Sequence, residues 1–355
     1  MSIVEIAKQA KVSISTVSRY FNQPDKVSTD AADRIRTVTA RLQYQPRIRR
    51  PGPKTPDRVG IKTGTIVFFS LGQVSPEEML RKPAFPVLLG SIQRSLIDRK
   101  ISLLLAHLEP TGAIPSCIDP RVCDGVILFG RCTKANVMEK LLKKLENLPA
   151  VWCFREHNDE NRHFDHILYD NRAVGAIAAE YLAERGHKQV GVFNTDPLHT
   201  AFKERVTIFC HRAEELGMTV TKFIAHGNET AIHQYQELAK MFLYDSSEIT
   251  GGFFCSDDIM LGVNNELRAS GVPVMKLDCI GCNDDEVLLR YLSPRPATIN
   301  IKMAEVGEMA VAQLLRRINE KQKSYSSEIL IKPELVKGGN APDLHHKDQP
   351  KQKVS

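Results

Sequence analysis

Hydrophobic residues recur at two different spacings along the chain, and the change of spacing divides it into two regions. In the first 45 residues they lie three and four positions apart, as in Ile3, Ile6, Ala7 and Ala10, which is the spacing of amphipathic helices. From residue 65 onward, short apolar runs alternate with longer amphipathic stretches, a pattern typical of strands followed by helices. The chain is therefore predicted to contain a small helical module followed by a large α/β body.

Short polar residues stand where the helices of the small module are predicted to begin. Ser2 and Glu5 are spaced as a capping box for the first helix. Ser13 can cap a second helix that extends to Asn22, and a third start follows at Ser28. Three short helices, of which the first two are joined by a three-residue turn, predict a helix-turn-helix unit.

The body is predicted to form doubly wound parallel sheets. Seven apolar runs are expected to be strands, at 65–71, 101–108, 124–130, 150–154, 189–194, 251–257 and 277–282. Six helices are expected between them, at 86–98, 134–147, 171–185, 201–216, 229–243 and 258–270. The series restarts after Gly186 and is long for one sheet, so we expect two lobes with a ligand cleft at the carboxyl ends of the strands.

The charge of the chain is unevenly distributed. The 355 residues carry 48 Lys and Arg against 42 Asp and Glu. Residues 1–62 hold 13 basic and 5 acidic residues, which leaves 35 basic and 37 acidic residues for the remainder. A basic module ahead of a nearly neutral body is the charge layout of a nucleic-acid binder with a separate control domain. No membrane-spanning stretch and no signal-peptide pattern are found, so a cytoplasmic location is expected.

Known catalytic motifs are absent from the sequence. No phosphate-binding loop, HExxH or GxSxG occurs. Cys279 and Cys282 form a lone CxxC pair with no second pair or nearby His to complete a zinc site. We therefore predict neither an enzyme activity nor a metal or cofactor.

A longer stretch of the helical module carries a recognisable pattern. The run IVEIAKQAKVSISTVSRYFN at 3–22, followed by VST at 27–29 and LQYQP at 42–46, resembles the headpiece of the lactose-repressor (LacI/GalR) family. This resemblance implies that Ile14, Ser15 and Arg19 contact operator bases in the major groove. It also implies that four polar residues hold the DNA backbone, namely Ser13, Thr16, Asn22 and Ser28. Ser18 is expected on the same outer face of the second helix, which suits contacts to DNA.

The next segment, residues 47–62, departs from that family. Its relatives continue into a helix that wedges a leucine into the minor groove, whereas the Pro-Gly-Pro run at 51–53 excludes a regular helix here. Two interpretations stay open. Either Arg47, Arg49 and Arg50 lie in a narrow A·T-rich minor groove, or the segment is a solvated linker.

Blocks of the body resemble the periplasmic-binding-protein-like core of the same family, to about Gly339. They are YDNRAVG at 169–175, LAERGH at 182–187, CSDDIMLG at 255–262, IGCND at 280–284 and PATI at 296–299. The resemblance implies a homodimer on a near-palindromic operator in double-stranded DNA. It also implies that a small molecule, a sugar or sugar derivative by default, binds between the lobes and changes operator affinity.

The resemblance further implies a set of effector-binding residues, namely Phe85, Asp170, Arg205, Ser256 and Asn283. Four of these residues have a plainer interpretation: Arg205 can be a surface residue of a helix, and Phe85 part of the core. Asp170 and Ser256 can simply cap the helices that follow them. Phe154 and Ile208 replace smaller or more polar residues of relatives, which predicts a more apolar or smaller pocket.

These observations predict four segments: a helix-turn-helix headpiece at 1–46, a basic hinge or linker at 47–62, a two-lobe core for effector binding and dimerisation at 63–338, and a disordered tail at 339–355. The predicted function is a sequence-specific DNA-binding regulator, acting as a repressor. A sugar-binding module of a transporter and an enzyme on a doubly wound fold are the alternatives. The headpiece argues against the first, and the absence of catalytic motifs against the second.

Overall fold

A computed structural model gives the fold of two compact units, Met1–Pro56 and Asp57–Ser355. The structure describes residues 3–22, 26–42, 60–72, 76–82, 84–108, 111–130, 135–154, 164–225, 230–245, 248–272, 277–320 and 325–339. Several predictions lie outside these residues: the capping serine at position 2, the hinge arginines Arg47, Arg49 and Arg50, and the tail beyond Gly339.

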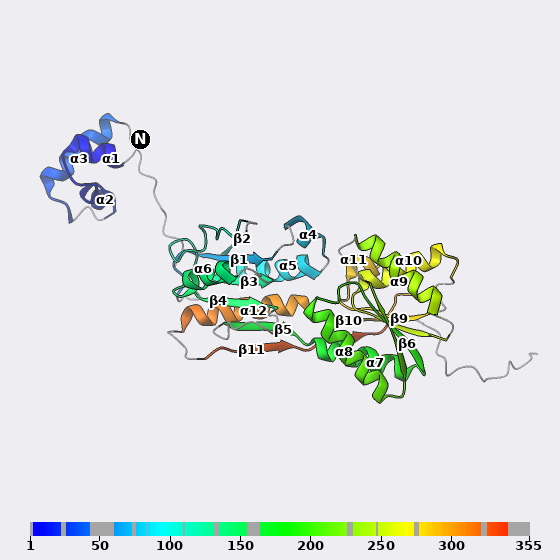
Figure 1. The fold of residues 1–355 in the computed structure, drawn as a ribbon. Coiled ribbons are helices and arrows are strands. Elements are labelled where there is room, and N and C mark those ends of the chain that lie inside the picture. Colours follow the sequence, from blue (N-terminus) through cyan, green and yellow to red (C-terminus); the bar gives the residue numbers. More distant parts are fainter. Residues whose placement is uncertain are drawn as a thin grey trace, which may run out of the picture. The chain divides into compact units, whose positions relative to one another are not determined.

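The first unit is a three-helix bundle (Figure 1). Its helices are α1 (Ile3–Ala10), α2 (Ile14–Asn22) and α3 (Thr29–Arg41). Side chains at helical spacing meet in one small core, formed by Ile6, Ala7, Ala10, Val17, Ile35 and Val38. The predicted helical module is confirmed, because its apolar positions are those that the bundle buries.

The first lobe of the second unit contains a six-stranded parallel sheet in the order β11-β5-β4-β3-β1-β2. The strands are β1 (Thr65–Leu71), β2 (Ser102–His107), β3 (Gly125–Gly130), β4 (Ala150–Cys153), β5 (Asp165–Tyr169) and β11 (Glu328–Ile331). The helices of this lobe are α4 (Pro76–Arg81), α5 (Ala84–Ile97), α6 (Ala135–Leu145) and α12 (Met303–Asn319). Helices α5 and α12 pack on one face of the sheet, and α6 packs on the other.

The second lobe contains a four-stranded parallel sheet in the order β7-β6-β8-β9. Its strands are β6 (Gln189–Asn194), β7 (Thr219–Ile224), β8 (Gly251–Phe254) and β9 (Asp278–Ile280). Its helices are α7 (Asn171–Glu184), α8 (Thr200–Glu215), α9 (Ala231–Asp245), α10 (Asp257–Ala269) and the short α11 (Glu286–Leu289). Helices α7 and α8 cover one face, and α9 and α10 cover the other (Figure 1).

The chain crosses between the two lobes three times. The first crossing joins β5 to α7, and the second joins β10 (Thr298–Asn300) to α12. The third joins β11 to β12 (Glu334–Val336), which pairs antiparallel with β10. The lobes are therefore linked by three neighbouring segments, which is the arrangement of a hinge.

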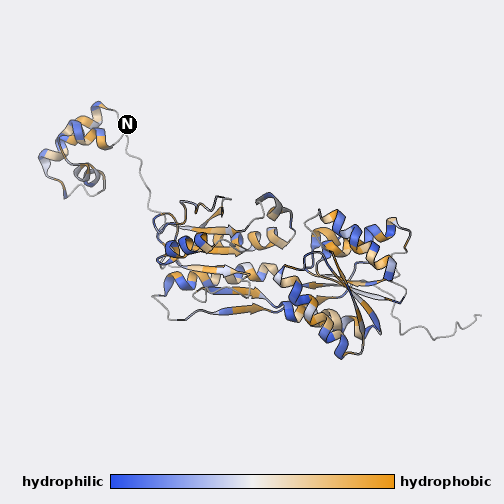
Figure 2. Cartoon of the chain, in the orientation of Figure 1, coloured by the Kyte–Doolittle hydropathy of each residue, from blue (hydrophilic) through white to orange (hydrophobic). Residues whose placement is uncertain are grey.

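Hydrophobic residues concentrate on the strands and on the inner faces of the helices (Figure 2). The predicted two-lobe α/β class with parallel sheets is confirmed. The sequence did not predict β7, because this edge strand carries Thr219, Thr221 and Lys222 and is only partly buried. It also left β5, α12 and the C-terminal strands unassigned. No helix in the described part of the chain is long and apolar enough to cross a membrane.

Candidate DNA-binding and effector-binding sites

Helix α2 is held in place at its start by a serine. The Thr16 backbone N–H donates to Ser13 Oγ at 3.0 Å, and the Ser13 hydroxyl also lies 2.7 Å from the hydroxyls of Ser15 and Thr16. The cap satisfies one of the free N–H groups of the first turn. The predicted capping role of Ser13 is therefore present in the structure.

The outer face of α2 is polar and accessible. Val17 is fully buried on the inner side, whereas Ser15 and Arg19 are exposed and Ile14 is 47% exposed. Thr16 and Ser18 are half-buried at the sides. Ser28 is exposed at the N-cap of α3 and makes no side-chain cap bond within the described residues. The helix thus presents short polar groups, one Arg and one apolar side chain, which suit base edges and phosphates.

Arg205 lies at the inner side of α8 and is 1% exposed. Its Nε donates to Asn171 Oδ1 at 2.9 Å, and its Nη1 donates to the carbonyl of Cys255. The guanidinium lies 5.5 Å from the centroid of the Tyr169 ring and 5.4 Å from that of Phe202. Arg205 is therefore not a surface residue. It joins α8, the first crossing and the end of β8.

Aromatic rings extend from Tyr169 into the first lobe. Phe154 lies 5.0 Å from Tyr169 and 5.6 Å from Phe129, between ring centroids. Phe85 packs 5.2 Å from Phe129 and is buried, so it belongs to the core of this lobe. The carboxyl ends of β3, β4 and β5 therefore carry a continuous aromatic row.

Two polar residues follow the ends of neighbouring strands in the second lobe. Ser256 comes directly after β8 and is 3% exposed; it makes no side-chain cap bond to α10, within the described residues. Asn283 follows β9, adopts a φ of 110°, and donates its backbone N–H to the Ile299 carbonyl at 2.9 Å. Both lie where ligands bind in parallel α/β folds, outside the carboxyl ends of the strands.

The remaining predicted residues have structural contacts. Asp170 caps α7, because its Oδ1 accepts the Ala173 N–H at 2.9 Å. Ile208 faces α7, where its Cβ would lie 3.1 Å from a Cβ on Gly175. Ile208 therefore lies where α7 and α8 pack closely, and its effect on the size of the pocket stays a prediction. Tyr169 and Asn171 belong to the block at 169–175, but their contacts with Arg205 were not predicted, because these contacts join segments more than 30 residues apart. Phe202, three positions before Arg205 on α8, was also missed.

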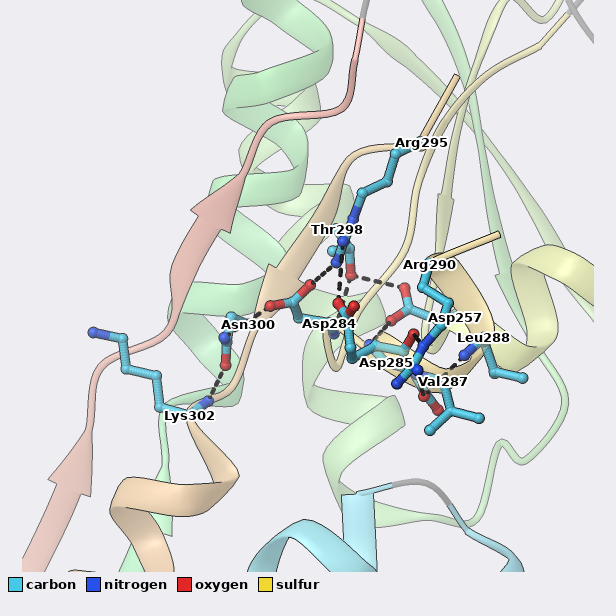
Figure 3. A network of polar contacts seen from close by, with 11 residues as sticks. Asp257, Asp284, Asp285, Val287, Leu288, Arg290, Arg295, Thr298, Asn300 and Lys302 are labelled. Carbon is cyan, nitrogen blue, oxygen red and sulfur yellow. Dashed lines mark hydrogen bonds and ion pairs between the residues drawn. The ribbon is translucent and has the colours of Figure 1, made fainter. Parts of the chain in front are cut away.

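A polar network joins the Asn283 loop to the second crossing (Figure 3). Asp284 pairs with Arg295 at 2.8 Å and accepts the side-chain N–H of Asn300 at 2.9 Å. Asp257, 1% exposed, accepts the Asp285 N–H at 2.8 Å and the Thr298 hydroxyl at 2.7 Å. Burial outweighs these hydrogen bonds and raises the pKa of Asp257 to about 7.

The cysteines of the described residues are free. Cys282 is buried, and burial raises the pKa of its thiol to about 12, which suppresses the reactive thiolate. Among the described residues, no group of three His, Cys, Asp or Glu side chains is placed to hold a metal ion.

A helix-turn-helix headpiece with a two-lobe, periplasmic-binding-protein-like core is the architecture of an effector-regulated DNA-binding protein. Residues 2–47 match the family model of the bacterial regulatory proteins of the lacI family, and residues 179–339 match that of the periplasmic binding protein-like domain. The chain belongs to the LacI family. It is a DNA-binding regulator of transcription and not an enzyme, as predicted.

Known proteins resemble it along nearly their whole length. The ribose operon repressor of Haemophilus influenzae is 25% identical over 344 residues, which are 94% of this chain and 96% of that protein. The complex of the regulator CelR with cellobiose has a TM-score of 0.65 at 18% identity and covers 95% of this chain and 99% of its own. The lac repressor dimer bound to operator and the anti-inducer ONPF has a TM-score of 0.63 at 18% identity, with coverages of 96% and 99%.

Proposed function

We propose that this protein is a homodimeric repressor of the cytoplasm that binds a near-palindromic operator and responds to a sugar or sugar derivative. The observation that carries the DNA-binding part is the capped helix α2, whose exposed face presents Ser15 and Arg19. Family membership supports the same function, since relatives are named as repressors.

The effector part of the proposal rests on the groups around Arg205. Strand ends of the second lobe supply hydrogen-bonding groups from Ser256 and Asn283, and the first lobe supplies the aromatic row. A sugar ring has an apolar face and a rim of hydroxyls, so it fits polar groups set over aromatic walls. One similar structure is a complex with cellobiose, and one similar protein is named as the repressor of a ribose operon. Both support this class of ligand.

The dimer is proposed because two headpieces must meet two half-sites, and because the lac repressor structure is a dimer on its operator. An apolar surface is available for it. Strand β2 forms one edge of the first sheet, where Leu104 is 39% and Leu105 57% exposed, and Val87 of the neighbouring α5 is 48% exposed. Exposed apolar groups on an edge strand are typical of an interface.

Selection of DNA from a random pool by the full-length protein tests the proposal first. We expect the selected DNA to be palindromic. The affinity of the protein for it should fall roughly 10³-fold or more between 50 and 200 mM salt, because several phosphates are contacted. Arg19→Ala should cost about 1–3 kcal/mol and relax the preference at one base pair, if Arg19 reads a base. If the protein is folded and yet enriches no DNA sequence, operator binding is contradicted.

Thermal unfolding with ribose, cellobiose and related sugars tests the effector. A ligand at 100 times its Kd should stabilise the core by about 2.7 kcal/mol. Arg205→Lys keeps a positive charge but loses the planar contact with Asn171, and it should abolish the shift. A shift that persists in this variant would remove Arg205 from the proposed site.

A further inference from the structure

Helix α12 connects the crossing between the lobes to the place where the linker enters the core. It begins at Met303, directly after the second crossing, and ends at Asn319. Its 17 residues span about 25 Å at 1.5 Å per residue. Figure 1 shows it extending from the junction of the lobes along the first lobe.

The first end of α12 is tied to the loop that carries Asn283. The Lys302 N–H donates to Asn300 Oδ1 at 2.6 Å, and Asn300 Nδ2 donates to Asp284 Oδ2 at 2.9 Å (Figure 3). Lys302 has a left-handed φ of 55°, and its Nζ pairs with Glu334 of the third crossing at 3.1 Å. Asp284, the neighbour of Asn283, is therefore joined through Asn300 to the residue that precedes this helix.

The start of the core is held by a single carboxylate. Asp124 accepts the N–H groups of Lys62 at 2.7 Å, Thr63 at 2.9 Å, Gly64 at 2.7 Å and Thr65 at 3.3 Å. It also accepts the Thr63 hydroxyl at 2.8 Å. Although burial opposes ionisation, these donors hold the pKa of Asp124 below its usual value. Asp124 thus anchors residues 62–65, where the predicted linker ends.

The second end of α12 touches this anchor. A Cβ on Gly60 would lie 2.8 Å from Asn319 Oδ1 and 2.9 Å from the Ile318 carbonyl. A Cβ on Gly125, the neighbour of Asp124, would lie 2.9 Å from Leu314 Cδ1. The Ile318 carbonyl leaves no room for a side chain at Gly60, so the last turn of α12 packs directly against the chain just before the anchored segment.

We propose that α12 couples the effector-site loop to the linker anchor, with Asn300 and Asp124 as the residues that fix its two ends. This inference rests on the proposed function, in which an effector changes operator affinity. A Cβ on Gly307 would meet the Leu88 carbonyl at 2.9 Å, so α12 and α5 pack with their backbones in close approach. The conformation of the Asn283 loop then determines the position of the last turn of α12 against Gly60.

Amide hydrogen exchange in the full-length protein tests the coupling without an effector. Asn300→Ala removes the link at one end of α12, and exchange at residues 62–65 is expected to rise about threefold or more, as for mutations that modulate coupling. Asn264→Ala is the matched control: Asn264 is equally half-buried but contacts Cys279 within the second lobe. It should leave exchange at 62–65 unchanged.

Unchanged exchange at 62–65 in folded Asn300→Ala would overturn the coupling. If Asn300→Ala does not fold, Glu334→Gln is used in its place. This variant removes only the ion pair with Lys302, and unchanged exchange at 62–65 in it would likewise overturn the coupling.

The selected operator provides a second, independent readout. Gly60→Ala pushes the anchor away from α12, and its operator Kd should change by about fivefold or more. Gly271→Ala carries the same strain, with φ of +83° against +81°, but nothing lies within 4 Å of the added methyl. Equal Kd values in the two variants would contradict the proposal. If the wild-type protein binds no operator, the proposed function fails, and the exchange experiment still decides the coupling.

Discussion

Two aspartates at helix starts in the second lobe have different environments. Asp170 is half-buried and its carboxylate accepts a backbone N–H of α7. Asp257, in the first turn of α10, is almost fully buried and accepts two hydrogen bonds. The carboxylate that keeps access to water therefore acts as an ordinary cap, whereas the buried one holds its proton to a higher pH.

The ionisation of Asp257 makes the stability of the core depend on pH. Its pKa is about 7 in the folded protein and returns to near 3.8 on unfolding. The contribution of the protonated form is fully present below pH 4 and is lost as the pH rises through 7, on the order of 4 kcal/mol. We expect the free energy of unfolding of the wild-type core to fall between pH 5 and 8 relative to that of Asp257→Asn, measured by urea titration. Parallel pH profiles of the two proteins would contradict this.

Substitutions of Asp170 can distinguish a helix-capping role of its carboxylate from an effector-binding role. Asp170→Ala should lower the stability of the core by about 1 kcal/mol, because the Ala173 N–H loses its partner. Asp170→Asn keeps an accepting oxygen and should restore that stability. We expect it also to retain the thermal shift produced by an effector sugar. A loss of the shift in the Asn variant alone would place the carboxylate in the effector site.

At the scale of elements, a glycine determines how α8 presents Arg205. A Cβ on Gly175 of α7 would lie 2.5 Å from the Arg205 carbonyl and 2.8 Å from the Phe209 N–H. The close approach of the two helix backbones brings the Arg205 side chain to Asn171 and Tyr169. The position of the candidate effector site thus depends on helix packing as well as on strand ends.

Two helical glycines give opposite predictions. Gly175→Ala should destabilise the core by about 1–3 kcal/mol, because the backbones of α7 and α8 must separate. Gly90→Ala on α5 meets only Arg94 Nη1 at 3.7 Å, and it should stabilise the core by up to about 1 kcal/mol through helix propensity. Thermal unfolding of the two variants measures both effects. Destabilisation by Gly90→Ala as well would contradict the packing explanation.

At the scale of the whole molecule, the two edges of the first sheet differ. Strand β2 exposes two consecutive leucines, whereas β11 at the opposite edge has Leu330 exposed between less exposed neighbours. The headpiece and core are separate compact units, so a dimer joined through the core leaves each headpiece available for a half-site.

The edge-strand dimer is tested by charge substitution. Leu105→Glu should shift the sedimentation equilibrium from dimer to monomer, because a charge cannot be buried unpaired in an apolar interface. Leu330→Glu is the control, with a similar exposed fraction of 52% against 57%. It should leave the dimer intact. A dimer of unchanged affinity in Leu105→Glu would place the interface elsewhere.

The sequence by itself determined the local features of this protein. The spacing of apolar residues and the cap at Ser13 predicted the headpiece helices, because these depend on residues a few positions apart. Fully apolar runs predicted the buried strands for the same reason. Motifs then identified the family and the neighbourhood of Arg205.

Tertiary structure decided the features that join distant segments. Arg205 contacts Asn171 and Tyr169, more than 30 residues away, and Asp124 holds residues 62–65 across about 60 residues. The edge strand β7, which has three polar residues among six, pairs in parallel with β6, about 30 residues earlier in the chain. Such contacts are fixed by packing over the whole chain rather than by local propensity, so no short pattern in the sequence encodes them.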